Sequence, residues 1–260
     1  MSNDDVHPGW LTLYVKDRTT ASLGAQVVVA KMRPGYPVSR LVADINVQVN
    51  QNSTPAQGAA STSDINKIAV ALGGADTFGT STFFRSDTIR LPSDGVYYIL
   101  NTSAKNGVDV VGDIEARGRV QNDRDSLDHS GTISLGNGTA DTITLRGQLP
   151  TTGTVKVRNN GDSVHLLAIS KVAKGVTDAQ VQAEYDNLMM GIFPTPGNDP
   201  ANLMGAPAPA TGSDAISPGH ASYLSYHLPK GTYLLQCFVD DSTTGIPHAF
   251  MGMHLIVHIG

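Results

Sequence analysis

The sequence is poor in cysteine, in charged residues and in long apolar segments. It contains 1 Cys among 260 residues, and Asp, Glu, Lys and Arg together make up 16%. A single Cys excludes an internal disulfide, and it also excludes metal sites that need two thiolates, such as an iron–sulfur cluster. The low charge argues against a protein built mainly from exposed charged helices.

The charge balance and the absence of certain motifs restrict the possible partners and activities. The net charge is −5 and no basic run is present, so nucleic acid and anionic membrane surfaces are poor partners. No run of about 18 apolar residues occurs, and the sequence therefore predicts no membrane span. There is no Gly-x-Ser-x-Gly, no phosphate-binding Gly-rich loop and no His-Glu-x-x-His, and the sequence thus gives no catalytic signature.

The start of the chain does not resemble a signal peptide. The abundance of Ser, Thr, Asn and Gly and the scarcity of Lys nevertheless favour an extracellular or cell-surface location. A cytoplasmic location remains open.

Short runs rich in β-branched and aromatic residues dominate the chain, separated by turns that draw on 27 Gly and 14 Pro. This pattern predicts an all-β fold. The predicted strands are 9–15, 25–32, 82–91, 96–100, 110–117, 142–146, 154–158, 165–171, 223–228, 233–238 and 254–259.

Two short helices interrupt the predicted strands. Residues 37–45 place apolar side chains on one side, and residues 177–190 do so over a longer stretch. The second helix has a start signal, since Thr177 can cap it and Gln180 completes a capping box. Loops are predicted over 51–63, 119–130 and 192–218.

The order of these elements repeats along the chain. Four groups of residues recur in the same sequence order in the two halves. They are Lys31-x3-Gly35 with Lys171-x3-Gly175, Ala43-Asp44 with Ala183-Glu184, Leu72-x-Gly74 with Leu203-x-Gly205, and Leu91-Pro92 to Tyr97 with Leu228-Pro229 to Tyr233. The repeat predicts an internal duplication. We therefore expect two tandem domains, 1–118 and 131–260, joined by a linker at 119–130 and each containing one short helix.

The only thiol of the chain begins a group of candidate metal ligands near the C-terminus. Cys237 is followed by His248 and Met253, and His165 is the best candidate for a fourth ligand. A thiolate, two imidazoles and a thioether together suit a soft, redox-active metal ion. Each residue also has an ordinary structural interpretation, because buried Cys and Met pack in cores and lone His residues occur on loops. Met251 is a competing thioether.

These residues lie in a pattern that resembles the cupredoxin family. The pattern reads Asn159-x-Gly161-x3-His165, then Gly231-x-Tyr233-x3-Cys237, then His248-x4-Met253. The resemblance implies Greek-key β-sandwiches, one mononuclear blue (type 1) copper ion held by His165, Cys237, His248 and Met253, and transfer of single electrons. Ten residues separate Cys237 from His248, a longer loop than in most small members of the family.

The same comparison implies that the first half is a degenerate copy without metal. At the positions of His165 and Cys237 it has Ala25 and Asn101. The resemblance also argues against an enzyme, since Gln236 precedes the cysteine where copper enzymes that feed a second copper site usually have His.

Two functions remain open on the sequence. The first is electron transfer by a copper ion in the second half, with a redox protein as partner. The second is a copper-free structural or adhesive extracellular protein that keeps the fold and self-associates. The complete ligand set favours the first function, and the long loop and metal-free first half favour the second.

Overall fold

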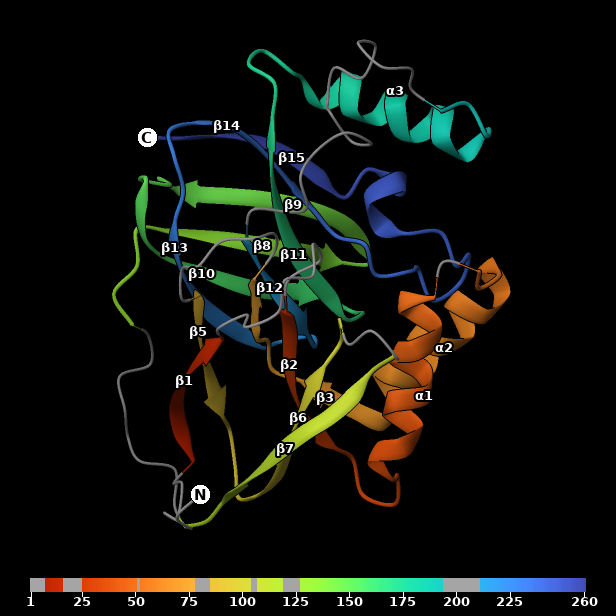
Figure 1. Cartoon of the computed structure of the whole chain (residues 1–260), viewed down its shortest axis with the longest axis vertical. Helices are drawn as coiled ribbons and strands as arrows, with labels where there is room; N and C mark the ends of the chain where they lie inside the picture. The colour runs from red at the N-terminus through yellow and green to blue at the C-terminus, as the bar shows by residue number, and fades with distance from the viewer. Residues whose placement is uncertain are drawn as a thin grey trace.

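The structure is a computed structural model, which describes residues 8–15, 25–50, 52–77, 85–103, 107–118, 127–193 and 211–260. Two large β-sheets face each other as a sandwich, with short helices on the outside (Figure 1), so the all-β prediction is confirmed. In the described part of the chain, no helix is long and apolar enough to cross a membrane.

The smaller sheet has 6 strands in the order β1-β5-β13-β10-β8-β9. Their bounds are Gly9–Val15 (β1), Arg85–Leu91 (β5), Ala221–His227 (β13), Thr152–Gly161 (β10), Gly131–Gly138 (β8) and Ala140–Gly147 (β9). All neighbours are antiparallel except β8 and β10, which pair in parallel.

The larger sheet has 9 strands, with the path β15-β14-β11-β12-β4-β2-β6-β7 and β3 paired to β2. Their bounds are His254–Ile259 (β15), Gly231–Gln236 (β14), His165–Val172 (β11), Thr211–Ile216 (β12), Ala75–Thr77 (β4), Ala25–Met32 (β2), Gly95–Asn101 (β6), Asp109–Ala116 (β7) and Ala69–Ala71 (β3). The prediction of a loop over 192–218 is wrong for β12, which is a buried central strand with a polar sequence, TGSDAI.

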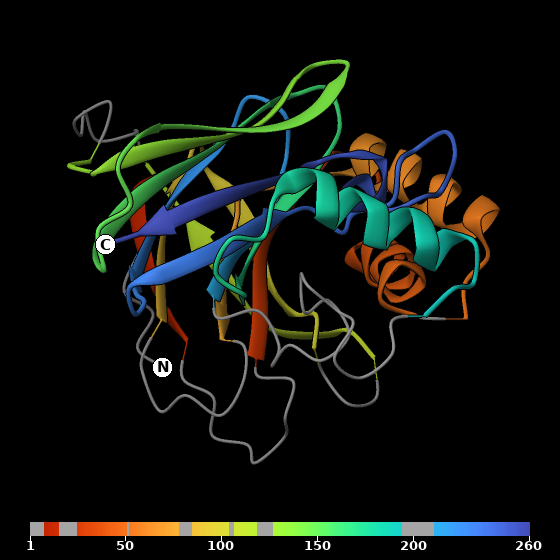
Figure 2. The same cartoon turned by 90° about the horizontal axis from the view of Figure 1, so that it is seen from above.

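The two halves of the chain join strand to strand in both sheets. In the smaller sheet β5 pairs with β13, with Asp87 opposite Leu224. In the larger sheet β4 pairs with β12, with Ala75 opposite Ser213. Each sheet therefore runs through both halves, and Figure 2 shows the strands of the two halves side by side. The division into domains at 119–130 stays a prediction.

Two glycines lie beside this junction at points where the backbone of a neighbouring strand passes close to them. A Cβ on Gly74 would lie 1.7 Å from the carbonyl oxygen of Val27, and one on Gly212 would lie 2.3 Å from that of Leu167. Both positions therefore exclude any side chain, because the neighbouring backbone passes too close. The predicted equivalent of Gly74, Gly205, lies outside the described residues.

The first half has two helices where the sequence predicted one. α1 (Val38–Val49) corresponds to the helix predicted at 37–45. α2 (Pro55–Ile68) replaces the predicted loop at 51–63. Thr54 caps α2 in a capping box with Gln57, and its buried face consists largely of small residues, Gly58, Ala59, Ser61 and Thr62. Hydrophobic periodicity misses such a face, since few large apolar residues mark it.

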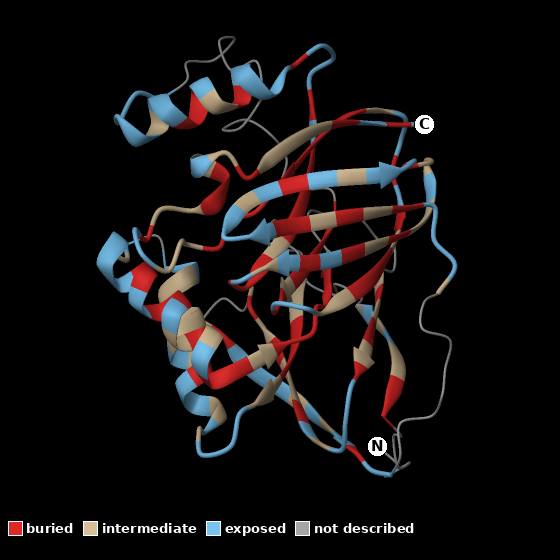
Figure 3. Cartoon of the chain, turned by 180° about the vertical axis from the view of Figure 1, so that it is seen from behind, coloured by how far each residue is buried: buried red, intermediate tan, exposed pale blue. Residues whose placement is uncertain are grey.

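The helix of the second half forms as predicted. α3 (Asp178–Met189) begins after Thr177, whose side chain accepts a hydrogen bond from the backbone N–H of Gln180 in the expected capping box. Val181 and Tyr185 are buried against Leu234 of β14. Figure 3 shows the opposite side of α3 exposed. α3 thus covers the outer face of β14 and β15.

Candidate metal centre

His165 is held at the start of β11 by a turn that the Asn159-x-Gly161 sequence builds. The side-chain amide of Asn159, fully buried, donates to the carbonyl oxygens of Ser163 and Ile216 at 2.7 Å each, and its Oδ1 accepts from the N–H of Gly161 at 2.8 Å. A Cβ on Gly161 would lie 2.7 Å from Nε2 of His165. The glycine thus leaves the space that the imidazole ring occupies.

Cys237 and His248 are fixed by backbone hydrogen bonds at the base of the loop between them. The N–H of His248 donates to Val239 O at 2.9 Å, and the N–H of Ala249 donates to Cys237 O at 2.7 Å. The loop enters a 3₁₀ turn, η1 (His248–Met251), before β15 begins. At its outer end the Asp241 carboxylate accepts from the N–H groups of Thr243 and Thr244. The long loop is therefore closed at both ends and places His248 beside Cys237.

Three of the four predicted ligands converge. Nδ1 of His165 lies 3.8 Å from Sγ of Cys237, Nδ1 of His248 lies 3.7 Å from the same sulfur, and the two Nδ1 atoms are 3.3 Å apart. The point equidistant from these atoms is about 2.1 Å from each, close to metal–nitrogen and metal–sulfur bond lengths of roughly 2.0–2.3 Å. The three donor atoms thus fit one metal ion without rearrangement.

The fourth predicted ligand, Met253, lies on the same segment and is fully buried in the same core cluster as Cys237. Its N–H donates to His248 O at 2.9 Å, and its carbonyl oxygen accepts from the N–H of Cys237 at 3.3 Å. The competing thioether, Met251, is 45% exposed, and its sulfur accepts from the Thr244 hydroxyl at 3.6 Å. Burial therefore distinguishes Met253 from Met251.

Burial controls the protonation of the three converging side chains. It lowers the pKa of His165 to about 3, with the neighbouring His248 as a second cause. Burial also lowers the pKa of His248, and it raises the pKa of the Cys237 thiol to about 12. Both imidazoles are thus neutral and carry a free lone pair, while the sulfur remains a thiol until a cation replaces its proton.

A carboxylate that the sequence did not single out faces both imidazoles from behind. The two oxygens of Asp141, in β9, lie 3.6 Å from Nε2 of His165 and 3.7 Å from Nε2 of His248. Neither Nε2 atom has a hydrogen-bond partner. Histidines that bind metals usually have a carboxylate or carbonyl group behind the ring, and Asp141 occupies this place.

No local signal could have identified Asp141. It lies near the start of an ordinary hairpin strand, and only the pairing of β8 with β10 brings that hairpin to His165. Asp141, Asp241 and His248 also form a second group of possible metal ligands. The Asp241 carboxylate is already used by the loop, which makes the His165, Cys237 and His248 group the stronger candidate.

His254 and Gln236 have structural contacts. His254 contacts Asp178 and Gln182 of α3. Gln236 accepts a hydrogen bond from Tyr185 of α3 and donates to Ser170 at 3.2 Å. In the first half, Asn101 uses its side chain to accept from Ser103. Among the described residues of that half, no group of His, Cys, Asp and Glu has metal-binding geometry.

No family model matches the chain, and no curated protein matches it. Among solved structures it is similar to dithionite-reduced auracyanin from Roseiflexus castenholzii, at 20% identity, covering 50% of this chain and 94% of that one with a TM-score of 0.29. Auracyanin A, a "blue" copper protein from Chloroflexus aurantiacus, matches at 13% identity over 50% and 99% of the two chains with a TM-score of 0.27. A multicopper oxidase from Pediococcus acidilactici matches at 11% identity over 98% and 50% with a TM-score of 0.27. At these values the comparisons do not assign a family, so any assignment of function depends on the geometry of the site.

Proposed function

We propose that the chain binds one copper ion through His165, Cys237 and His248, with Met253 as a weaker fourth ligand, and that it carries single electrons. The observation that supports this most directly is the convergence of two Nδ1 atoms and one Sγ within 3.3–3.8 Å of one another. Copper would supply a one-electron couple that none of the protein side chains supplies at ordinary potentials.

The donor set favours copper over other metals. Two imidazoles and one thiolate in a plane, with a thioether nearby, are typical of copper electron-transfer sites. Structural zinc sites usually have four imidazole or thiolate ligands, and the chain has a single Cys. A thioether adds little to zinc binding and much to Cu(I) binding.

The frame around the site supports a role in electron transfer. Cys237 and His248 are 0% and 1% exposed and are tied to each other through Ala249 and Val239. A rigid, buried donor set changes little when the charge of a bound ion changes, which favours fast electron exchange. The thiol of Cys237 also accepts the N–H of Leu166 at 3.4 Å, a contact that stabilises negative charge on the sulfur.

We further propose that the protein is a carrier and not an enzyme. Gln236, the residue before the cysteine, is engaged with Tyr185 and Ser170, so it offers no route to a second metal. The partner would be a redox protein. Two exposed apolar side chains give such a partner an apolar contact near the site: Phe238 lies in the loop between Cys237 and His248, here called the donor loop, and Met251 follows that loop. The proposed location is extracellular or at the cell surface.

Addition of Cu(II) to the purified, metal-free chain tests the proposal. We expect one copper per chain and an intense visible absorption from the bond between thiolate and copper. Cys237→Ser should abolish the absorption and leave the fold intact, because the change in volume is small. Met253→Leu should shift the spectrum and the reduction potential, whereas the matched variant Met251→Leu should shift neither.

A colourless wild-type protein without stoichiometric copper would contradict the proposal. The copper-free structural function would then remain, with self-association as its measurable property. A coloured protein in which Met251→Leu and Met253→Leu behave alike would contradict only the role of Met253.

A further inference from the structure

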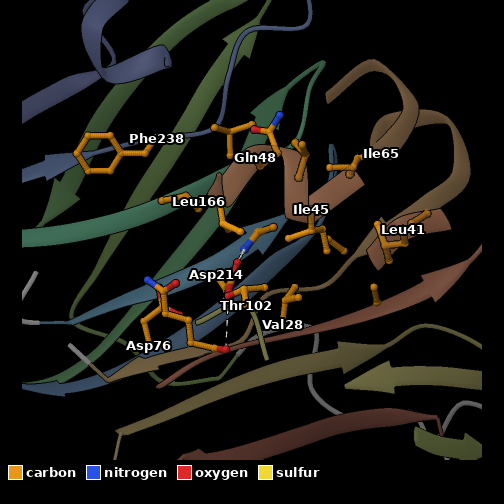
Figure 4. Close-up of a pocket in the computed structure, with 18 of the residues that line it drawn as sticks. Val28, Leu41, Ile45, Gln48, Ile65, Asp76, Thr102, Leu166, Asp214 and Phe238 are labelled. Atoms are coloured by element: carbon orange, nitrogen blue, oxygen red, sulfur yellow. Dashed lines mark hydrogen bonds between the residues drawn. The ribbon is translucent and has the colours of Figure 1, made fainter. Parts of the chain in front are cut away.

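A cavity of about 350 Å³ lies between the larger sheet and helices α1 and α2. Its walls are mostly apolar, with Leu41 and Ile45 from α1, Ile65 from α2, Val28 from β2 and Leu166 from β11 (Figure 4). Two exposed apolar side chains that line it, Val49 and Phe238, are 45% and 41% accessible and place its opening between α1 and the donor loop. The volume is within the range of small-molecule sites, roughly 300–1,000 Å³.

The end of the cavity away from Phe238 is acidic (Figure 4). Asp76 of β4 and Asp214 of β12 line it, and both are buried, at 2% and 7% exposure. Asp214 has two partners, because its carboxylate accepts from the Thr102 hydroxyl at 3.0 Å and from the N–H of Ala215 at 2.6 Å. Oδ1 of Asp76 is buried and has no hydrogen-bond partner.

In the part of the chain that the structure describes, no positive charge is paired with the carboxylates at this end of the cavity. Among the described residues, neither Asp76 nor Asp214 forms an ion pair with Lys, Arg or His. Burial raises the pKa of both carboxyl groups, and the negative charge of Asp214 raises the pKa of Asp76 further. A buried carboxylate without a partner is costly, and a bound cation would offset that cost.

The residues that line the cavity determine what kind of cation can bind. A metal ion such as Ca²⁺ requires six or more oxygen ligands, whereas the described side chains at this end of the cavity are two carboxyl groups, the amide of Gln26 and the Thr102 hydroxyl, which is already bonded to Asp214. Behind them the lining is aliphatic over Val28, Ile45 and Leu166. A ligand must therefore combine a compact cationic head with an apolar body.

We propose that the cavity binds a small amphiphilic amine, with its ammonium group between Asp76 and Asp214 and its alkyl or aryl body against the walls formed by α1, α2 and the sheet. The ammonium group supplies the hydrogen-bond donor that Oδ1 of Asp76 lacks. The acidic end of this site contains none of the candidate metal ligands and needs no metal, although Leu166 and Phe238, which line the cavity, are sequence neighbours of His165 and Cys237.

Titration calorimetry of the full chain with three ligands of equal length tests the proposal. The ligands are n-octylamine, n-octanol and n-octanoate, which share the apolar tail and differ in the charge of the head. We expect one octylamine per chain, with weaker binding of octanol and the weakest binding of octanoate. Equal affinity for octanol and octylamine, stronger binding of octanoate, or no binding of octylamine would overturn the proposal.

Variants test the role of the carboxylates. Asp76→Asn, which preserves size, should weaken octylamine binding more than about tenfold and leave octanol binding unchanged within about twofold. Asp109→Asn is the matched control on exposed β7 and should change neither. Ala168→Leu, which adds volume inside the lining, should weaken the binding of all three ligands. An Asp76→Asn chain that binds octylamine as wild type does would overturn the proposal, as would one that loses octanol equally while its unfolding transition is unchanged.

Discussion

Replacing Asp87 by Asn measures how far the charge of one buried acid at the junction of the two halves lowers the free energy of unfolding. Asp87 lies in β5 opposite Leu224 of β13, and its side chain is 0% exposed. Oδ2 accepts from the Ser213 hydroxyl at 2.7 Å, whereas Oδ1 is buried without a partner. Asn has nearly the same shape, so the substitution removes the ionisable group with little change in packing.

The size of the effect follows from the pKa of Asp87. Burial raises it to about 7, although hydrogen bonds from Ser213, Ser222 and two backbone N–H groups act in the opposite direction. In the unfolded chain the pKa is about 3.9. Between these values the folded protein binds a proton that the unfolded chain does not bind. The free energy of unfolding therefore falls as the pH rises from about 4 to about 7, by about 4 kcal/mol for this group.

Urea unfolding of the wild type and of Asp87→Asn at pH 4.5 and at pH 8 checks this value. We expect the variant to gain stability relative to the wild type between pH 4.5 and pH 8 by about 3 kcal/mol, because part of the titration lies below pH 4.5. Asp109→Asn, on an exposed strand, should show no such gain. The reasoning is refuted if the difference between Asp87→Asn and the wild type is the same at both pH values to within about 1 kcal/mol.

Three further substitutions test other parts of the structure. Thr177→Ala should lower the free energy of unfolding by about 1 kcal/mol, since it removes the N-cap of α3; an unchanged urea midpoint would contradict the cap. Gly212→Ala should prevent folding or destabilise the chain strongly, because the new Cβ would lie 2.3 Å from a backbone oxygen. Gly153→Ala should be tolerated, because its Cβ would meet only side-chain atoms. Equal thermal unfolding temperatures of the two variants would contradict this reasoning. Asp141→Asn should weaken copper binding about 10–100-fold in a competition assay with a chelator, and unchanged affinity would exclude a role behind the imidazoles.

The local parts of the fold could be predicted from the sequence. The capping box at Thr177 and Gln180 predicts α3, and the structure contains it. The same signal occurs at Thr54 and Gln57, but without a run of large apolar residues it does not distinguish a helix from a polar loop. The face of α2 is made of small residues because the loop after Cys237 packs against it, with Asp240 so near that a Cβ on Gly58 would clash. That constraint comes from the tertiary structure and leaves no periodicity in the sequence.

Some residues of the candidate site could likewise be predicted from the sequence, and others could not. Order along the chain identifies His165, Cys237 and His248, since His165 begins β11, Cys237 follows β14, and the loop between them returns His248 to Cys237 before β15. The burial of Met253 agrees with its place in the pattern. Asp141 depends on a parallel pairing between β8 and β10, which are separated by β9 in sequence, and such long-range pairing has no local signal.

The junction between the halves brings together acids that lie far apart in the sequence, among them Asp214 in the predicted loop at 192–218. Around it the register is symmetric, since Gly212 lies opposite Asp76 and the N–H of Asp214 donates to Gly74 O. Residues two positions apart on paired antiparallel strands share a face, so Asp76 and Asp214 are diagonal neighbours on the face of the larger sheet that lines the cavity under α1 and α2. The repeat in the sequence pairs Gly74 with Gly205, so it does not make Asp76 and Asp214 equivalent, and the symmetric register alone places the two like charges beside each other. Such a pair is unfavourable unless the groups stay protonated or a cation lies between them, and the cavity beside them has room for one.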